Sequence, residues 1–114
     1  MNLGPLPSVD AAAVPAEGFV LDVREDDEWA AGHVEGALHV PMSDFVARFG
    51  EVTEAVADGR TAYVMCRVGG RSAQVTQYLV RQGIEAVNVD GGMQAWDRAG
   101  RPMVTDNGNP AFVL

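Results

Sequence analysis

The sequence predicts an α/β domain built on a mainly parallel β-sheet. Short apolar runs that end at polar or glycine residues alternate with segments in which apolar residues recur at helical spacing. The 114 residues are 47% hydrophobic and 21% charged, which suits one domain with a packed core and argues against disorder. No internal repeat or low-complexity segment is present. We therefore expect a single domain.

The first forty residues contain two predicted strands. Residues 1–7 are rich in proline and glycine and are expected to lie extended on the surface, and Ser8 is a candidate N-cap for a helical turn over residues 10–13. The apolar runs at residues 19–21 and 37–40 read as short buried strands.

A helix is predicted between these two strands. All four residues from 25 to 28 are acidic, which suits the positive end of the helix dipole. Trp29 and Ala30 supply an apolar side, and Gly32 ends the helix.

The next helix is expected to begin at Ser43, a good N-cap. Its apolar residues recur at helical spacing: Phe45, Phe49, Val52 and Val56. Gly50 is expected to break this segment into two pieces, and residues 58–60 form a turn before the central strand.

The central strand, residues 62–65, stops at Cys66, the only cysteine of the chain. A loop with two glycines and Arg71 follows. Val75, Tyr78 and Leu79 then lie on one face of a helix, for which Gly83 is a natural C-cap.

The last strand is predicted at residues 86–89, and two glycines turn the chain into a short helix over residues 93–99. The tail to Leu114 is expected to be irregular, although residues 112–114 could dock. In open α/β sheets, sites gather at the carboxyl ends of the strands. Residues 22–24, 66–71 and 90–92 should therefore share one edge of the sheet.

The loop after the central strand is suited to an anion. Glycines allow backbone N–H groups to converge on one point, and the first N–H groups of the following helix lack partners. Arg67 and Arg71 add full positive charges, so the pKa of Cys66 should be lowered and its thiolate, the nucleophilic form, favoured. The alternative is an inert buried cysteine, which is common but does not require such a loop.

Composition excludes several classes of function. The net charge of −8 argues against nucleic acid as a partner, and no apolar run is long enough to span a membrane. One cysteine allows no internal disulfide, and residues 1–10 do not resemble a signal peptide, so a cytoplasmic protein is expected. His33 and His39 lack partners at metal-ligand spacing, so neither a metal nor a cofactor is expected.

Three stretches follow one another along the chain. The first is Leu21-Asp22-Val23-Arg24-Glu25, continued by Glu28-Trp29, Gly32-His33, Gly36-Ala37 and Pro41. The second is Cys66-Arg67-Val68-Gly69-Gly70-Arg71-Ser72, and the third is Asp90-Gly91-Gly92-Met93 with Ala95-Trp96. Together they resemble the amino-terminal signature, active-site loop and carboxy-terminal signature of the single-domain rhodanese family of sulfurtransferases.

The resemblance implies a rhodanese-like three-layer domain over residues 1–114, with a five-stranded, mainly parallel sheet flanked by helices. Its motif-bearing core covers about residues 14–104 and is followed by the irregular tail. It also implies a thiosulfate:cyanide sulfurtransferase-like enzyme in which Cys66 carries a persulfide between two half-reactions. Four residues separate Cys66 from Arg71, as in sulfurtransferases of this fold, whereas the related phosphatases have one more.

The expected roles follow from the loop. Cys66 and Arg71 are the catalytic candidates, and the substrate-binding candidates are Arg67, Val68, Gly69, Gly70 and Ser72. Arg67 could instead face solvent, and Ser72 could simply cap the helix. Asp22 and Arg24 are expected to support the site as a structural pair.

The expected partners are a small anionic sulfur donor and a protein that donates persulfide sulfur or accepts it on a thiol, because the chain has no second cysteine. Two other functions stay open at this point. One is a phosphatase or arsenate reductase that uses the same loop. The other is a non-catalytic recognition module that binds its partner through the acidic surface.

Overall fold

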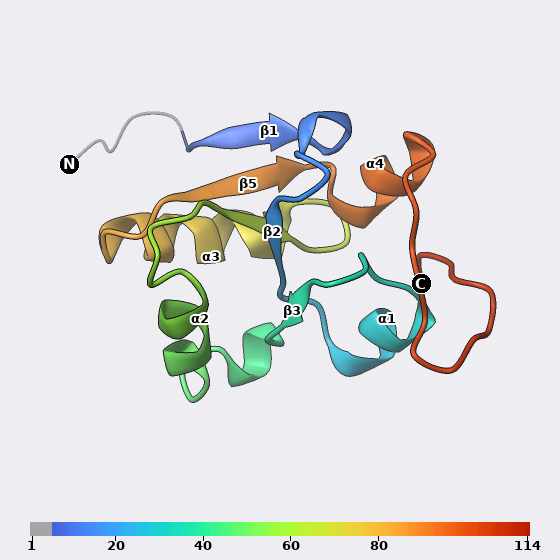
Figure 1. The fold of residues 1–114 in the computed structure, drawn as a ribbon, viewed down its shortest axis with the longest axis horizontal. Helices are drawn as coiled ribbons and strands as arrows, with labels where there is room; N and C mark the ends of the chain where they lie inside the picture. Colours follow the sequence, from blue (N-terminus) through green and yellow to red (C-terminus); the bar gives the residue numbers. More distant parts are fainter. Residues whose placement is uncertain (1–5) are drawn as a thin grey trace.

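The structure of the chain is a computed structural model, and it describes residues 6–114. The predicted extended segment at residues 1–7 therefore lies mostly outside the described residues. Five strands form one sheet in the order β1-β5-β4-β2-β3, and every pair of neighbours is parallel (Figure 1). Their bounds are β1 Ser8–Asp10, β2 Phe19–Asp22, β3 Leu38–His39, β4 Ala62–Met65 and β5 Ala86–Asp90. The predicted parallel α/β fold is confirmed.

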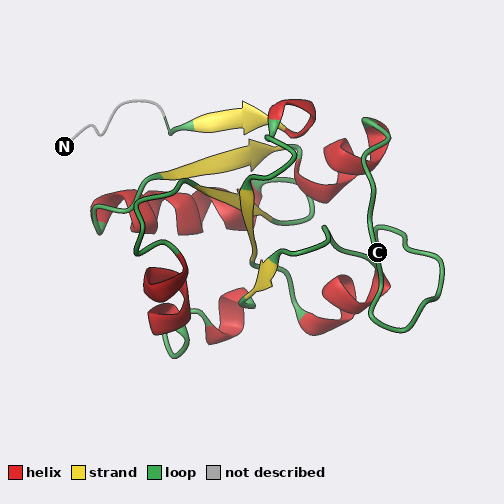
Figure 2. Cartoon of the chain, viewed as in Figure 1, coloured by secondary structure: helices red, strands yellow, loops and turns green. Residues whose placement is uncertain are grey.

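Within residues 6–114, three α-helices and two short 3₁₀ helices lie between successive strands, and a fourth α-helix follows β5 (Figure 2). The α-helices are α1 Asp26–Ala31, α2 Phe49–Ala55, α3 Gly70–Arg81 and α4 Gly92–Arg98. The 3₁₀ helices are η1 Ala11–Ala13 and η2 Met42–Asp44.

The sheet separates two apolar cores, and β4 contributes alternate residues to each. Ala62, Val64 and Cys66 join the core under α2 and α3, whereas Met65 joins the core formed with η1 and α4. This alternation follows from the two-residue period of a strand. Helices therefore cover both faces of the sheet, as a three-layer domain requires.

The register brings the carboxyl ends of the central strands to one edge. Asp22 at the end of β2 pairs with Met65 at the end of β4, and the Val23 N–H donates to the Met65 carbonyl oxygen at 2.9 Å. Residues 22–24, 66–71 and 90–92 consequently lie along a common edge, as predicted from topology.

The amino terminus departs from the prediction. Ser8 lies in β1 and not at a helix cap, and its hydroxyl donates to the Leu6 carbonyl oxygen. The helical turn exists as η1, but its N-cap residue, Asp10, makes no side-chain capping hydrogen bond. Parallel pairing with β5 explains why so short a segment is a strand.

The segment after Pro41 also departs from the prediction. Ser43 lies inside η2 and caps no α-helix, because its hydroxyl donates to Glu25 Oε1 at 2.7 Å. Gly50 lies inside α2 and does not divide it; the interruption falls before Phe49, where the chain makes turns.

The C-terminal segment is irregular and docks, as expected. The Phe112 N–H donates to the Ala31 carbonyl oxygen, and Val113 packs on the core beside α4. Figure 1 shows this segment running past α4 and looping out beside α1. Within residues 6–114, no helix combines the length and apolar character needed to cross a bilayer.

Candidate functional site

Cys66 lies at the bottom of the loop that joins β4 to α3. Gly69 has a φ of 112°, a left-handed conformation that favours glycine, and it turns the backbone over the sulfur. The Gly69 N–H donates to Cys66 Sγ at 3.0 Å, and the Ser72 Oγ lies 3.2 Å from the same sulfur. The cysteine is only 1% exposed, so the surrounding loop shields its sulfur from solvent.

Two opposing effects act on the pKa of Cys66. Burial alone raises it, because removal from water disfavours the thiolate. The Ser72 hydroxyl and the backbone N–H groups of Ser72, Gly69 and Val68 act in the other direction, and together they lower the pKa below its ordinary value. The loop thus favours the nucleophilic form of the sulfur.

Helix α4 fixes the backbone of this loop from the neighbouring strand end. The Met93 N–H donates to the Cys66 carbonyl oxygen at 2.9 Å, and the Gln94 N–H donates to the Arg67 carbonyl oxygen at 3.1 Å. A Cβ on Gly92 would lie 2.4 Å from the Cys66 oxygen, so only glycine permits this approach. Asn88 of β5 adds a further contact, from its Nδ2 to the Gly69 carbonyl oxygen at 3.3 Å.

Arg71, in the first turn of α3, is engaged by a carboxylate of the same chain. Its Nη1 and Nη2 donate to the two carboxylate oxygens of Glu28 at 2.7 and 2.8 Å, a bidentate pair between α3 and α1. The Glu28 side chain is 14% exposed and that of Arg71 34%. These hydrogen bonds hold the pKa of Glu28 at about 2 and raise that of Arg71.

The carboxylate of Glu28 is itself held in place. Its Oε1 accepts the Glu25 N–H at 3.0 Å, which closes a capping box at the start of α1. The Glu25 carboxylate in turn accepts the Ser43 hydroxyl. Arg71 is therefore bound to a preorganised carboxylate.

Asp22 and Arg24 form a fully buried ion pair beneath the site. Arg24 Nη2 lies 2.7 Å from Asp22 Oδ2, and both side chains are at most 1% exposed. The guanidinium also donates to the carbonyl oxygens of Glu28, within α1, and of Gly32, directly after it. The pair thus fastens α1 to the end of β2, an arrangement that fits the structural role expected for it.

Arg67 and Val68 form the outer wall of the loop. Arg67 Nε donates to the Leu114 carbonyl oxygen at 2.9 Å, so this side chain turns toward the docked tail. Val68 is 52% exposed. Val68 on the loop and Phe112 and Leu114 on the tail therefore all expose apolar surface.

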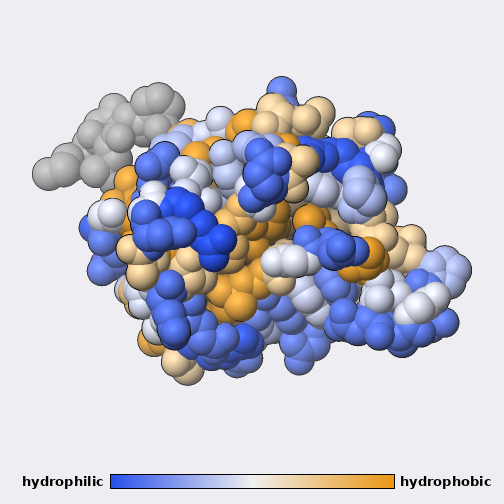
Figure 3. Space-filling view, viewed as in Figure 1, coloured by the Kyte–Doolittle hydropathy of each residue, from blue (hydrophilic) through white to orange (hydrophobic). Residues whose placement is uncertain are grey.

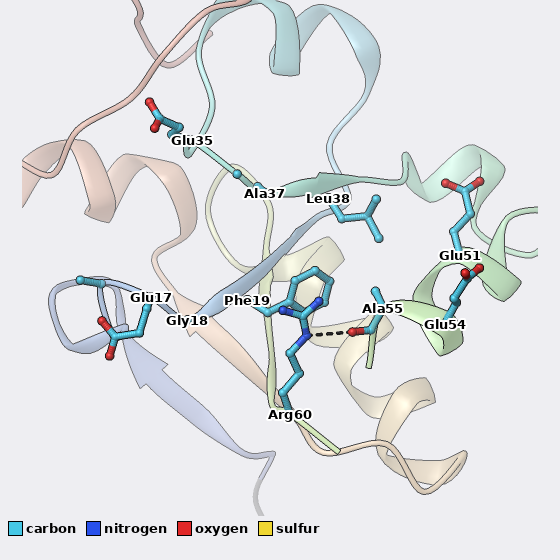
Figure 4. A pocket seen from close by; sticks show the side chains of 12 residues that line it. Glu17, Gly18, Phe19, Glu35, Ala37, Leu38, Glu51, Glu54, Ala55 and Arg60 are labelled. Atoms are coloured by element: carbon cyan, nitrogen blue, oxygen red, sulfur yellow. Dashed lines mark hydrogen bonds between the residues drawn. The ribbon is translucent and has the colours of Figure 1, made fainter. Parts of the chain in front are cut away.

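A separate hollow lies at the amino ends of β2 and β3. It has a volume of about 640 Å³, and Figure 3 shows apolar side chains exposed in the middle of this face of the molecule. Figure 4 shows Arg60 over the Phe19 ring, with its Nε donating to the Ala55 carbonyl oxygen, and glutamates around the rim. The lining of the hollow contains no Cys, Ser, Thr or Lys side chain, and the Cys66 loop is the candidate site that we pursue.

Both histidines contact Trp29. The ring of Trp29 stacks on His33 and on His39, with centroids 3.6 and 4.5 Å apart. His33 Nδ1 and His39 Nε2 also lie within hydrogen-bond distance of backbone carbonyl oxygens. Among residues 6–114, no group of three or more His, Cys, Asp or Glu side chains could hold a metal ion.

Glu28 and Asn88 contact the site through their side chains, and the sequence analysis did not assign either of them to it. Nothing in the sequence indicates that Asn88 would contact the Cys66 loop. For Glu28 a signal exists, because a cation at a helix N-terminus opposes the helix dipole and so calls for an anion beside Arg71. In the structure that anion is a carboxylate 43 residues earlier in the chain.

The chain is a parallel three-layer α/β domain, and a cysteine with a lowered pKa follows its central strand. This combination is typical of proteins that use a thiolate in a loop as a nucleophile. The model of the rhodanese-like domain matches residues 9–99. The chain belongs to this family, as the sequence motifs predicted.

Individual relatives agree with this assignment. YtwF of Bacillus subtilis is 40% identical over 86 residues, covering 75% of this chain and 80% of its own. A protein of Allochromatium vinosum named sulfurtransferase is 37% identical over 91 residues, which cover 79% of this chain and 81% of that protein. At the level of the family, the chain is a rhodanese-type sulfurtransferase.

Solved structures share the fold. The crystal structure of a rhodanese-related protein from Thermoplasma volcanium has a TM-score of 0.78 at 29% identity, covering 88% of this chain and 99% of that one. The thiosulfate sulfurtransferase of Pseudomonas aeruginosa has a TM-score of 0.74 at 29% identity, covering 92% of this chain and 21% of the larger one. The predicted three-layer arrangement is therefore confirmed.

Proposed function

We propose that the protein transfers a sulfane sulfur through a persulfide on Cys66. The observation that carries the proposal is the hydrogen bonding of Cys66 Sγ. The Gly69 N–H donates to this sulfur, and the Ser72 hydroxyl lies within hydrogen-bond distance of it. These donors favour the thiolate before transfer and the persulfide anion after it, as preorganised donors stabilise an oxyanion.

The proposed reaction has two displacements at sulfur. The Cys66 thiolate attacks the outer sulfur of thiosulfate or of another persulfide donor, and the bond to the leaving group breaks. The outer sulfur of the Cys66 persulfide then passes to an acceptor thiol or to cyanide, which restores the thiolate. Cys66 and Arg71 are the proposed catalytic residues. Arg67, Val68, Gly69, Gly70 and Ser72 are proposed to bind substrate, with Asp22 and Arg24 as support.

Mass spectrometry of the intact protein tests the proposal. Incubation with thiosulfate or a low-molecular-weight hydropersulfide is expected to add one sulfur atom, about 32 Da, which a reductant removes, because the thiolate is the attacking species. The Cys66→Ser variant should gain no mass. If no donor modifies the wild-type protein, the proposal is wrong.

The same preparation separates the competing functions. Hydrolysis of an aryl phosphate, or reduction of arsenate, that disappears in Cys66→Ser would favour the phosphatase or reductase alternative. The four-residue spacing between Cys66 and Arg71 favours sulfur transfer. A protein that neither accepts sulfur nor turns over phosphate or arsenate would fit a recognition module.

A further inference from the structure

The charge available to a bound anion at the Cys66 loop depends on Glu28. Both terminal nitrogens of Arg71 donate to the Glu28 carboxylate, at 2.7 and 2.8 Å, so its positive charge is paired although this contact uses only two of its five N–H donors. The pair is sheltered, since the Glu28 side chain is only 14% exposed, and the carboxylate is fixed further by the Glu25 N–H. An anionic donor that approaches this guanidinium therefore also meets the negative charge of Glu28.

The other two arginines near the loop also have partners within the chain. Arg24 is fully buried and paired with Asp22. Arg67 turns its Nε to the Leu114 carbonyl oxygen. The anion-binding groups that remain directed at the sulfur are the loop amides and the Ser72 hydroxyl, which are dipoles and not full charges.

We propose that Glu28 is a specificity-determining residue: by neutralising Arg71, it biases the Cys66 loop toward uncharged or singly charged hydropersulfide donors and against the thiosulfate dianion. The inference rests on the proposed function of Cys66 as sulfur acceptor and narrows the class of donor.

The two donors place different demands on the loop. With a hydropersulfide, the Cys66 thiolate attacks the outer sulfur, the donor S–S bond breaks, and its electron pair leaves with the inner sulfur as one thiolate. The proton stays on the transferred sulfur, and no other reactant is needed. With thiosulfate the leaving group is sulfite, which carries two negative charges, and the positive charge of Arg71 that would stabilise it is already paired with a carboxylate.

The test compares second-order rate constants of Cys66 persulfidation for thiosulfate and for cysteine hydropersulfide. The wild type is expected to react faster with the hydropersulfide. Glu28→Gln should raise the thiosulfate-to-hydropersulfide ratio about tenfold, because one released positive charge acts more strongly on a dianion. Glutamine keeps an oxygen for the Glu25 N–H, so the capping box survives.

Asp26→Asn is the matched control. Asp26 is an exposed carboxylate in the first turn of the same helix, so the variant removes the same charge without touching Arg71. Its donor ratio should change less than about twofold, because an exposed charge is well screened. If Glu28→Gln does not fold, Glu28→Asp is measured in its place. Its shorter side chain weakens the bidentate pair, and the ratio should move in the same direction.

Alkylation provides a readout that does not depend on sulfur transfer. The ratio of Cys66 alkylation rates with anionic iodoacetate and neutral iodoacetamide reports the potential at the sulfur, and Glu28→Gln should raise this ratio too. If both donors load the wild type but neither ratio moves, or if thiosulfate is already preferred, the role of Glu28 is wrong and the proposed function stands. If no donor loads the wild type, both proposals fail, whatever the alkylation ratio shows.

Discussion

At the scale of single residues, burial and hydrogen bonding have opposite effects on the pKa of Cys66. The sulfur is 1% exposed, which opposes ionisation, and the Ser72 hydroxyl is the one side-chain donor that offsets this among the causes of its lowered pKa. The other contributions come from backbone N–H groups, which no side-chain substitution removes. Ser72 is therefore the residue through which the ionisation of Cys66 can be altered most directly.

Ser72→Ala is expected to raise the pKa of Cys66, because burial then acts against fewer donors. The pH profile of iodoacetamide alkylation should move to higher pH, and the rate at neutral pH should fall several-fold. Ser8→Ala, an exposed position in β1, is the control and should leave the profile unchanged. An unaltered profile in Ser72→Ala would mean that the backbone amides suffice.

Most residues of the candidate site could be named from the sequence, because they follow one another in the chain as a single loop. The cysteine, the glycines, Ser72 and Arg71 lie within seven residues. What Arg71 faces could not be predicted, since Glu28 reaches it only after β2, α1 and β4 have assembled. Read alone, Glu28 was one of four acidic residues suited to a helix N-terminus.

At the scale of elements, α4 acts as a clamp on the loop. Its first N–H groups bind the carbonyl oxygens of Cys66 and Arg67, and this requires the close approach of Gly92. Gly92 also has a φ of 55°, in the left-handed region. Backbone contact with the loop therefore explains Gly92, whereas Gly91 is the N-cap of α4, where its φ is 77° and a Cβ would meet the Ala95 side chain.

Gly92→Ala should destabilise the protein by about 3 kcal/mol. The new Cβ would lie 2.4 and 2.6 Å from backbone atoms of the loop, and the alanine would have to adopt a left-handed backbone conformation. Thermal unfolding should show a midpoint at least about 10 °C lower. Gly50→Ala inside α2 is the matched control. Its Cβ meets nothing within 4 Å, and it should be neutral or raise the midpoint slightly. A Gly92→Ala protein as stable as wild type would contradict the clamp.

The elements differ in how far the sequence predicts them. Strand β4 was predicted at its observed bounds because its apolar run ends sharply at Cys66. Strand β1 was missed from the residues alone because Ser8-Val9-Asp10 has one apolar residue, and pairing with Asn88, Val89 and Asp90 makes it a strand. Ser43 failed as a helix cap because Glu25, distant in sequence, takes its hydroxyl. Long-range partners decided both cases.

At the scale of the whole molecule, the net charge of −8 acts on every anion that approaches Cys66. The radius of gyration is 13.2 Å, so at an ionic strength of 0.01 M, where the screening length is about 30 Å, the charge of the entire protein reaches the loop. At 0.1 M the screening length is about 10 Å, and mainly the groups around the loop are felt.

Salt should therefore favour the anionic reagent. Raising the ionic strength from about 0.01 to 0.1 M is expected to increase the ratio of iodoacetate to iodoacetamide alkylation of Cys66 about threefold, because long-range repulsion of the anion is screened. A short neutral peptide with one cysteine is the control, and its ratio should stay nearly constant. A ratio that falls with salt would mean that the loop presents a net positive potential strong enough to overcome the charge of the rest of the chain. Arg71 would then act as an available cation despite its contact with Glu28.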